Sequence, residues 1–383
     1  MISTKTKTAY IVLALVCAAG LASWIYQLMG GLSVTGMNNG VSWGLYIANF
    51  MFFVGLSAGG LIVASSAHVF GIESFKKVAM PAVICSITCV CCAGAFVLID
   101  LGGIQRIWRM ITGPNPMSPL VWDMCVITCY LIINILDLVW MAKGQEEKVR
   151  KLSYVALPVA ILVHSVTAWI FGLQIAREWY SAIMAPIFVA SALDSGLALV
   201  LIALISLEKL KVFETGHDLI AKLARLLATF IAVDAFFIGC EVLTMGYPGA
   251  DGAHALWIMA TGATAPYFWF ELICGLLIPF LILASNKRRQ SYGAIVVASA
   301  LTVAGVFCKR LWLLFTSFVT PNVFGGNGIT LGNQNVIAGH GGSIWSPLGI
   351  YAPTGVEIVI ALSVIAAGVL IFMVLARLVM KRK

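Results

Sequence analysis

Residues 43–71 read WGLYIANFMFFVGLSAGGLIVASSAHVFG, and this stretch decides the fold. It contains no Lys, Arg, Asp or Glu, and it exceeds the roughly 20 apolar residues that a helix needs to cross a bilayer. Similar stretches recur from Tyr10 almost to the end of the chain. The 383 residues are 61% hydrophobic and 10% charged, which lies outside the usual composition of soluble globular domains. We therefore expect an all-α, polytopic membrane protein.

The apolar stretches predict ten membrane spans in one integral-membrane domain, residues 1–383. The first span follows Lys5 and Lys7 and lacks a small-residue cleavage site, which favours a retained helix over a signal peptide. Similar depths of Ala58–Leu61 and Asp194–Leu197 suggest that spans two to five and six to nine form two four-helix bundles, with the remaining helices flanking them. The expected spans are residues 9–29, 43–70, 78–101, 120–142, 152–172, 183–207, 222–245, 263–285, 291–316 and 354–379.

The positive charges lie mainly on one side of these spans. The formal net charge is +8, but basic residues at helix ends indicate a lipid bilayer rather than a nucleic acid as the partner. Of the 24 Lys and Arg residues, all but five fall on the side of the N-terminus. The positive-inside rule then places both termini in the cytoplasm. The five exceptions are Arg106, Arg109, Arg177, Lys309 and Arg310.

Polar side chains within the spans are costly and are treated as functional candidates, with helix pairing as the competing interpretation. Most of them fall in the outer half of the membrane, which predicts a polar cavity opening outward. His164, Asp194 and Asp234 lie nearer the middle, and His68 and Asp137 lie towards the cytoplasm. The outer-half group is Gln27, Asn49, Asp100, Asp123, Glu241, Glu271, Lys309, Arg310 and Glu357.

Asn49 lies beside a stripe of small residues in the second span, where helices can approach closely. Its amide can hydrogen-bond a quinone oxygen, and an interhelical hydrogen bond is the alternative. Gln27 lies at a similar outer depth and is assigned to the same binding site. Asp100 and Asp123 flank an outer loop; a carboxylate beside an apolar pocket can accept a proton. An ion pair between Asp100 and Arg106 or Arg109 is the alternative for that residue.

His164, on the fifth span, can accept a proton or bind the second quinone oxygen, with a plain interhelical hydrogen bond as the alternative. Haem b needs paired axial histidines at matching depths. His68 and His164 differ in depth by roughly 15 Å at the helical rise, so no haem is expected. His217, His254 and His340 have no metal-binding spacing, and no metal is expected either.

The long outer segment 317–353 is rich in Gly and Asn and is interpreted as a docking face for a partner. A loop packed over its own helices is the alternative. The ten cysteines include Cys85, Cys89, Cys91 and Cys92 in one apolar helix. Cysteine in such a helix behaves as a small apolar residue, so packing is favoured over iron–sulfur ligation.

Three motifs resemble the NrfD-like family of membrane subunits, which includes the anchor of polysulfide reductase. They are residues 43–49 (WGLYIAN) continuing to 55–60 (GLSAGG), residues 115–119 (NPMSP) followed by Trp122 and Asp123, and His164-Ser165 leading to Trp179 and Pro186. The resemblance implies a subunit of a bacterial or archaeal cytoplasmic membrane that binds menaquinol or ubiquinol near the outer face. It also implies a docked iron–sulfur, ferredoxin-like subunit and a molybdopterin or multihaem catalytic subunit.

Carried onto this sequence, the resemblance places the quinone-site residues at Asn49, Asp100 and His164. It also places a mid-membrane proton relay at Asp194, Asp234 and Glu271. Quinone would be an exchangeable substrate, and the subunit would not be catalytic alone. Asp100 and His164 are the expected proton-accepting pair. Two rivals remain. One is a secondary transporter with a midplane acidic site at Asp194 and Asp234. The other is a redox-driven proton pump that uses Asp194 and Asp234 as a relay to His68 or Asp137 on the cytoplasmic side.

Overall fold

The computed structural model describes residues 4–38, 41–174, 177, 179–247, 249–319 and 351–380. Within these ranges the chain is helical and holds no β-strand. The expected ten spans correspond to ten long apolar helical segments. Nine are single helices: α1 (Thr4–Gly30), α2 (Leu45–Val69), α3 (Glu73–Asp100), α5 (Pro119–Ala142), α6 (Glu146–Gly172), α7 (Met184–Lys209), α8 (His217–Gly246), α12 (Tyr292–Val319) and α14 (Gly355–Met380).

The remaining span is divided into three helical pieces. These are α10 (Ala265–Trp269), the π-helical segment η3 (Phe270–Leu277) and α11 (Ile278–Ala284). A π-helical segment widens the turn and is frequent at functional sites. The shorter elements are η1 (Gly31–Val34), η2 (Ile104–Arg106), α4 (Arg109–Thr112), α9 (Ala250–Thr261) and η4 (Arg288–Gln290).

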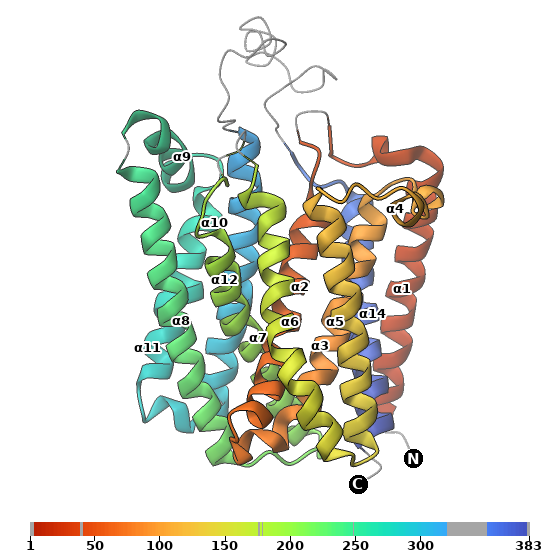
Figure 1. The fold of residues 1–383 in the computed structure, drawn as a ribbon, viewed down its shortest axis with the longest axis vertical. Helices are drawn as coiled ribbons and strands as arrows, with labels where there is room; N and C mark the ends of the chain where they lie inside the picture. Colours follow the sequence, from red (N-terminus) through yellow and green to blue (C-terminus); the bar gives the residue numbers. More distant parts are fainter. Residues whose placement is uncertain are drawn as a thin grey trace, which may run out of the picture.

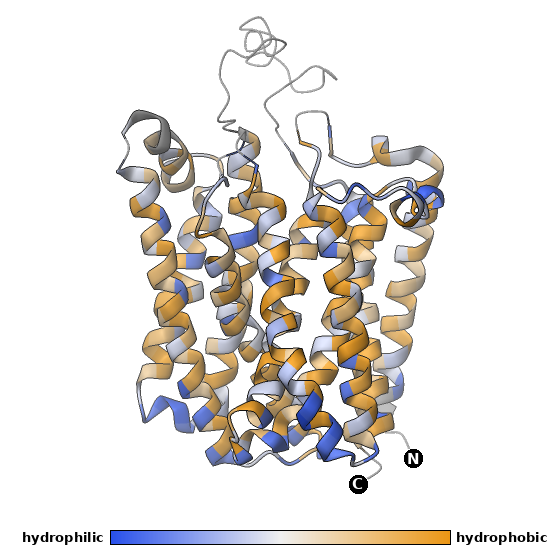
Figure 2. Ribbon diagram, in the orientation of Figure 1, coloured by the Kyte–Doolittle hydropathy of each residue, from blue (hydrophilic) through white to orange (hydrophobic). Residues whose placement is uncertain are grey.

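The helices stand side by side, and α1 begins at the same end of the molecule at which α14 ends (Figure 1). We call this end the terminus face, and the opposite end, which carries α4 and α9, the loop face (Figure 1). Hydrophobic residues dominate the middle of the helices, and hydrophilic residues gather towards the two ends (Figure 2). This distribution suits helices whose central part is surrounded by lipid.

Besides α1, which begins at Thr4 rather than 9, three helices begin earlier at the terminus face than the hydropathy pattern predicts. Helix α3 begins at Glu73 rather than 78, α6 at Glu146 rather than 152, and α8 at His217 rather than 222. Each carries an acidic residue in its first turn, where the positive end of the helix dipole stabilises it. These turns are too polar for a hydropathy window, yet they continue the helix beyond the apolar segment.

The spans pack as two bundles. Helices α2, α3, α5 and α6 form the first bundle, and α7, α8, the eighth span and α12 form the second, while α1 and α14 pack together against α3. The bundles meet where α2 crosses α7. A Cβ added to Gly59 of α2 would lie 2.4 Å from the Cα of Gly196 of α7, so the crossing requires glycine.

Glu357, one of the polar residues singled out in the sequence, stabilises the start of α14. Its Oε2 accepts hydrogen bonds from the backbone N–H of Thr354 (2.9 Å) and of Gly36 (2.7 Å). Thr354 and Glu357 thus form a capping box. The Tyr351 hydroxyl donates to Glu357 Oε1 (2.5 Å) and accepts from the Leu45 N–H (2.8 Å). Burial and the Glu357 carboxylate raise the pKa of Tyr351, so the hydroxyl keeps its proton and remains a donor.

The cysteines of α3 pack between helices. Cys85, Cys89 and Cys92 are buried, and all three are free thiols. The Cys92 thiol donates to the Val364 carbonyl (3.6 Å) and lies where a Cβ on Gly368 would be. Cys92 therefore joins α3 to α14 as a small apolar side chain.

Candidate functional site

Three charged side chains meet at the centre of the second bundle. Lys309 Nζ of α12 lies 2.7 and 3.0 Å from the two carboxylate oxygens of Asp234 on α8 and 3.5 Å from Glu271 Oε1 on η3. All three are fully buried or nearly so. The Trp312 indole N–H donates to the second oxygen of Glu271. Excluding water strengthens these interactions, and removing any one of the partners would leave an uncompensated buried charge.

A second cation and a third carboxyl group lie beside this cluster. Arg310 Nη2 donates to Ser191 Oγ (2.7 Å), and its guanidinium lies 4.0 Å from the centroid of the Phe188 ring. Arg310 Nε and Nη1 have no hydrogen-bond partner within the described part of the chain, and neither does Asp194 Oδ2. Buried polar atoms without protein partners usually contact ordered water.

The charges of this group do not cancel. Asp194, Asp234 and Glu271 supply three carboxyl groups, whereas Lys309 and Arg310 supply two cations, and all five are buried. An uncompensated charge in such a site is costly. The group is electrically neutral when one carboxyl holds a proton. We call these five residues the ion cluster. It contains all three members of the predicted proton relay, two of which share Lys309 as a partner.

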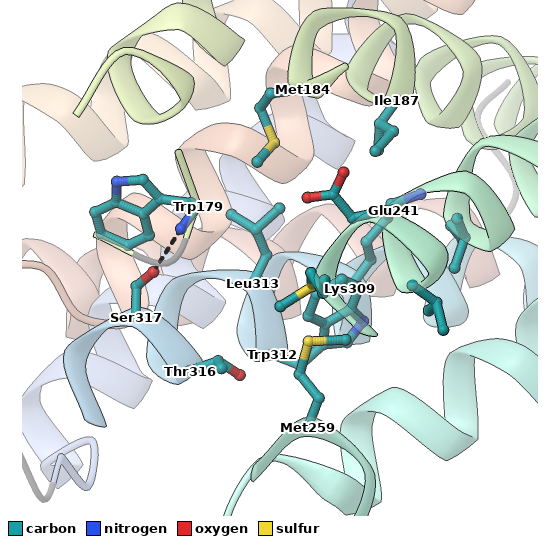
Figure 3. Close-up of a pocket in the computed structure, with 13 residues that line it drawn as sticks. Trp179, Met184, Ile187, Glu241, Met259, Lys309, Trp312, Leu313, Thr316 and Ser317 are labelled. Carbon is teal, nitrogen blue, oxygen red and sulfur yellow. Dashed lines mark hydrogen bonds between the residues drawn. The ribbon is translucent and has the colours of Figure 1, made fainter. Parts of the chain in front are cut away.

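A pocket extends from Lys309 along α12 to Ser317, and Figure 3 shows the side chains that line it. Lys309 lies at its inner end, and Glu241 of α8 projects into it (Figure 3). Glu241 Oε2 accepts a hydrogen bond from Ser181 Oγ (2.9 Å). The other side chains are largely apolar or aromatic: Trp179, Met184, Ile187, Ile238, Val242, Met245, Met259, Trp312, Leu313, Thr316 and Ser317. Apolar walls with a few directed polar groups are typical of sites for small organic ligands.

The pocket is narrow in this conformation. Its enclosed volume is about 30 Å³, enough for about two water molecules. Met184, Met245 and Met259 line it, and methionine side chains adapt their shape readily. An aromatic headgroup therefore requires these side chains to change rotamer.

Aromatic residues surround the loop-face end of the pocket. The backbone N–H of Trp179 donates to Ser317 Oγ (2.9 Å), shown as a dashed line in Figure 3. The Arg177 guanidinium lies 4.8 Å from the centroid of the Phe318 ring and 5.9 Å from that of Trp179. Partial burial lowers the pKa of Arg177. Arg177 is thus a cation held against aromatic faces at the loop face.

The predicted quinone-site residues lie in and around the first bundle and are not in one cluster. Gln27 and Asp100 are neighbours: Gln27 Nε2 donates to the Ile99 carbonyl (3.2 Å), and its Oε1 accepts from the Tyr46 hydroxyl (2.7 Å). Asp100 Oδ1 is buried, and the described residues offer it no hydrogen bond. The alternative of an ion pair with Arg106 or Arg109 is not seen among the described ion pairs.

Asp123 and His164 form a second location. Asp123 Oδ1 accepts from Thr167 Oγ1 (2.6 Å), and Thr167 lies one turn from His164 on α6. His164 Nε2 lies 3.5 Å from the Gly55 carbonyl, and its Nδ1 has no protein partner in the described ranges. Asn49 donates to the Leu45 carbonyl of its own helix (2.8 Å).

Glu241, Trp179 and Trp312 line the pocket and were not predicted as site residues. Ser181, which was not predicted either, donates a hydrogen bond to Glu241. Helical spacing offered a signal for part of this set. Asp234 and Glu241 are seven residues apart and share one face of α8, and Lys309 and Trp312 share one face of α12. Trp179 and Ser181 lie between α6 and α7, where no helical period indicates their direction.

Two other predictions concern histidine and the outer segment. His68 lies near the terminus-face end of α2 and lines a pocket there, whereas His164 is buried near the middle of α6. No group of three His, Cys, Asp or Glu side chains suited to a metal ion occurs in the described residues. Most of the predicted docking segment 317–353 lies outside the described residues.

A family model described as polysulphide reductase, NrfD, matches residues 33–322. The chain belongs to the NrfD family. The resemblance found in the sequence motifs is thereby confirmed. This family gives the secondary-transporter alternative no support.

Relatives of this NrfD-family chain are membrane subunits of reductases and oxidoreductases. One from Halobacterium salinarum, named as a putative membrane subunit of dimethyl sulfoxide reductase, is 35% identical over 94% of this chain and 88% of its own. The Hdr-like menaquinol oxidoreductase integral membrane subunit of Archaeoglobus fulgidus is 30% identical over 82% of this chain and 80% of its own length. A more distant relative, the "Probable Ni/Fe-hydrogenase 2 b-type cytochrome subunit" of Escherichia coli, is 23% identical over 92% of this chain and 87% of its own length.

Proposed function

We propose that this chain is the quinol-handling membrane subunit of a respiratory oxidoreductase and that quinol binds in the pocket of the second bundle. The observation that carries this proposal is the position of Glu241 and Lys309 in an otherwise mostly apolar pocket beside the ion cluster. The menaquinol oxidoreductase subunit among its relatives supports the substrate class. The subunit has no catalytic activity by itself.

The chemistry follows from the two polar groups. The Glu241 carboxylate accepts a proton from one quinol hydroxyl, and Ser181 holds the carboxylate in position. Quinol oxidation releases two protons and two electrons, leaving quinone. The electrons pass to a docked iron–sulfur subunit, and from it to a molybdopterin or multihaem subunit. The second proton leaves by the ion cluster, where Asp194, Asp234 and Glu271 serve as a relay.

The same proposal extends to cofactors and orientation. His68 and His164 lie at different depths, so the chain carries no haem, and the absorption spectrum of the purified chain checks this. The membrane is the cytoplasmic membrane of a bacterium or archaeon. The basic terminus face is on the cytoplasmic side, and the loop face carries the docked subunit.

The test is quinol oxidation by the purified complex, followed through reduction of the partner's iron–sulfur clusters. Loss of a general base typically lowers the rate by about a hundredfold or more, so Glu241→Gln should do so while the complex remains assembled. Glu208→Gln is the matched control, because Glu208 lies near the terminus-face end of α7 and, among the described residues, accepts a hydrogen bond only from the Tyr292 hydroxyl (2.7 Å).

The sequence-based site provides the competing outcome. Asp100→Asn and His164→Gln remove the two groups expected to accept protons in the first bundle. A wild-type rate of quinol oxidation in Glu241→Gln, together with loss of that activity in either of these variants, would show that quinol binds in the first bundle.

A further inference from the structure

The buried face of α5 is unusually polar for a membrane helix. Of its five buried residues, four are polar: Asp123, Tyr130, Asn134 and Asp137. Apolar residues such as Ile132, Ile135 and Leu136 are exposed where lipid would surround the helix. Tyr130 and Asp137 are seven residues apart and therefore on the same face. A polar stripe directed into a bundle marks a route for ions, protons or water in membrane proteins.

At the terminus-face end of this stripe, Asp137 has no protein partner. Its side chain is 1% exposed, and both carboxylate oxygens lack a hydrogen bond to any described residue. Asn134, one turn away, donates to the Tyr130 carbonyl (2.8 Å), but its own oxygen is also unpaired in the described structure. Groups of this kind hydrogen-bond internal water when space allows.

A cavity lies at the terminus face, one helical turn from Asp137. A pocket of about 270 Å³ opens at the terminus face, far more than a single water needs. Met141 of α5, one turn from Asp137, lines it. Polar groups around it include His68 of α2, Lys77 of α3 and Gln145 before α6. The pocket therefore brings water to within about one helical turn, roughly 6 Å, of Asp137.

Three hydroxyl groups continue the stripe into the membrane. Tyr130 Oη lies 3.0 Å from Ser57 Oγ of α2 and 2.7 Å from Ser86 Oγ of α3. The two serine hydroxyls are 3.2 Å apart, and all three residues are buried. Ser57 is two residues from Gly55, whose carbonyl faces His164. Closed hydroxyl networks of this type can pass a proton when each oxygen both donates and accepts.

We propose that the part of this stripe from Asp137 to Tyr130 is a proton inlet, in which water held by Asn134 and Asp137 links the terminus-face pocket to the hydroxyl network of Tyr130, Ser57 and Ser86. Each step transfers a proton between hydrogen-bonded oxygens and moves no electron. The inlet lies in the first bundle and shares no residue with the ion cluster. It goes beyond the proposed function, because it operates whether or not quinol binds in the second bundle.

The test measures exchange of the Tyr130 hydroxyl proton for deuterium in the full chain in liposomes, without quinol or partner. Infrared spectra after transfer to D₂O follow the band that is lost in Tyr130→Phe. Removing the acid–base group should slow this exchange by about a hundredfold in Asp137→Asn, and Asp137→Glu should restore it. Thermal unfolding of each variant confirms that the fold is retained.

Asp123→Asn is the matched variant, because Asp123 lies on the same face of α5 but near the loop face. It should leave the exchange rate unchanged. Slow exchange in Asp123→Asn with normal exchange in Asp137→Asn would show that protons reach Tyr130 from the loop face. Normal exchange in both variants would show that no inlet depends on Asp137. Either result overturns the proposal independently of quinol oxidation. If Asp137→Asn does not fold, Asn134→Leu, which removes the adjacent water-binding oxygen, must slow the exchange instead.

Discussion

At the scale of single residues, Lys309 holds the second bundle's charged groups together. It contacts Asp234 and Glu271 from a position without solvent exposure. The desolvation cost of such a group is large, so its presence is weak evidence for stability by itself. Its removal is a different matter, because Asp234 and Glu271 would then lose the cation that they share.

Lys309→Met should therefore lower the free energy of unfolding by about 3–5 kcal/mol. Thermal or denaturant unfolding of the purified chain in detergent measures this change. Adding Asp234→Asn and Glu271→Gln to Lys309→Met should recover most of the loss, because the unpaired carboxyl groups are then neutral.

The control for this prediction is Lys151→Met. Lys151 forms a pair with Glu147 (2.7 Å) in which both side chains are 71% exposed. Exposed pairs contribute little, so this variant should unfold like the wild type. Equal stability of Lys309→Met and Lys151→Met would contradict a structural role for the buried ion pair.

At the scale of elements, hydropathy predicted the spans because each bilayer crossing requires a long apolar helix. It could not predict the additional polar turns of α3, α6 and α8, which lie beyond the apolar segment. The sequence placed Asp194 and Asp234 nearer the middle of the membrane and Glu271 in the outer half, whereas the structure brings Asp234 and Glu271 together around one lysine. Their partner Lys309 was recognised as polar but not as their counterion, because pairing between α8, η3 and α12 depends on packing.

The pocket illustrates the same limit. Glu241 was placed in the outer half from the helical rise, but the sequence does not show which helix faces it. Trp179, which lines the pocket, and Ser181, which donates to Glu241, belong to the connection between α6 and α7, whose path no periodicity describes. A site composed across five segments thus emerges only when the bundle is assembled.

The crossing of α2 and α7 gives a prediction at this scale. In Gly59→Ala the new methyl group would lie 2.4 Å from the Gly196 Cα and 2.7 Å from the Ala192 carbonyl oxygen. Both obstacles are backbone, so the two bundles must separate, at a cost of about 1–3 kcal/mol. A lower unfolding midpoint in detergent is the expected measurement.

Gly94→Ala serves as its control. Gly94 lies within α3, and a Cβ there would meet nothing within 4 Å. Alanine favours a helix over glycine, so this variant should be as stable as the wild type or slightly more stable. A Gly59→Ala protein that matches Gly94→Ala would show that the crossing tolerates a methyl group.

At the scale of the whole molecule, the two faces differ in chemistry. The terminus face carries most of the positive charge and the water-accessible pocket below Asp137, whereas the loop face carries the end of the Glu241 pocket and the aromatic residues around Arg177. In the two proposals made above, protons enter from the terminus face, and quinol and electrons are exchanged near the loop face. Which side of the membrane each process uses depends on the orientation of the molecule.

The orientation is tested by labelling single added cysteines with a membrane-impermeant maleimide in right-side-out vesicles. Met117, 78% exposed at the loop face, and Glu147, 71% exposed at the terminus face, are suitable positions. Because the basic face is expected in the cytoplasm, Met117→Cys should react at once and Glu147→Cys only after the vesicles are opened. The wild-type chain, with its ten native cysteines, gives the background. Labelling of Glu147→Cys alone in closed vesicles would show that the orientation is the opposite one. The proposed Asp137 inlet would then take up protons from the outer side.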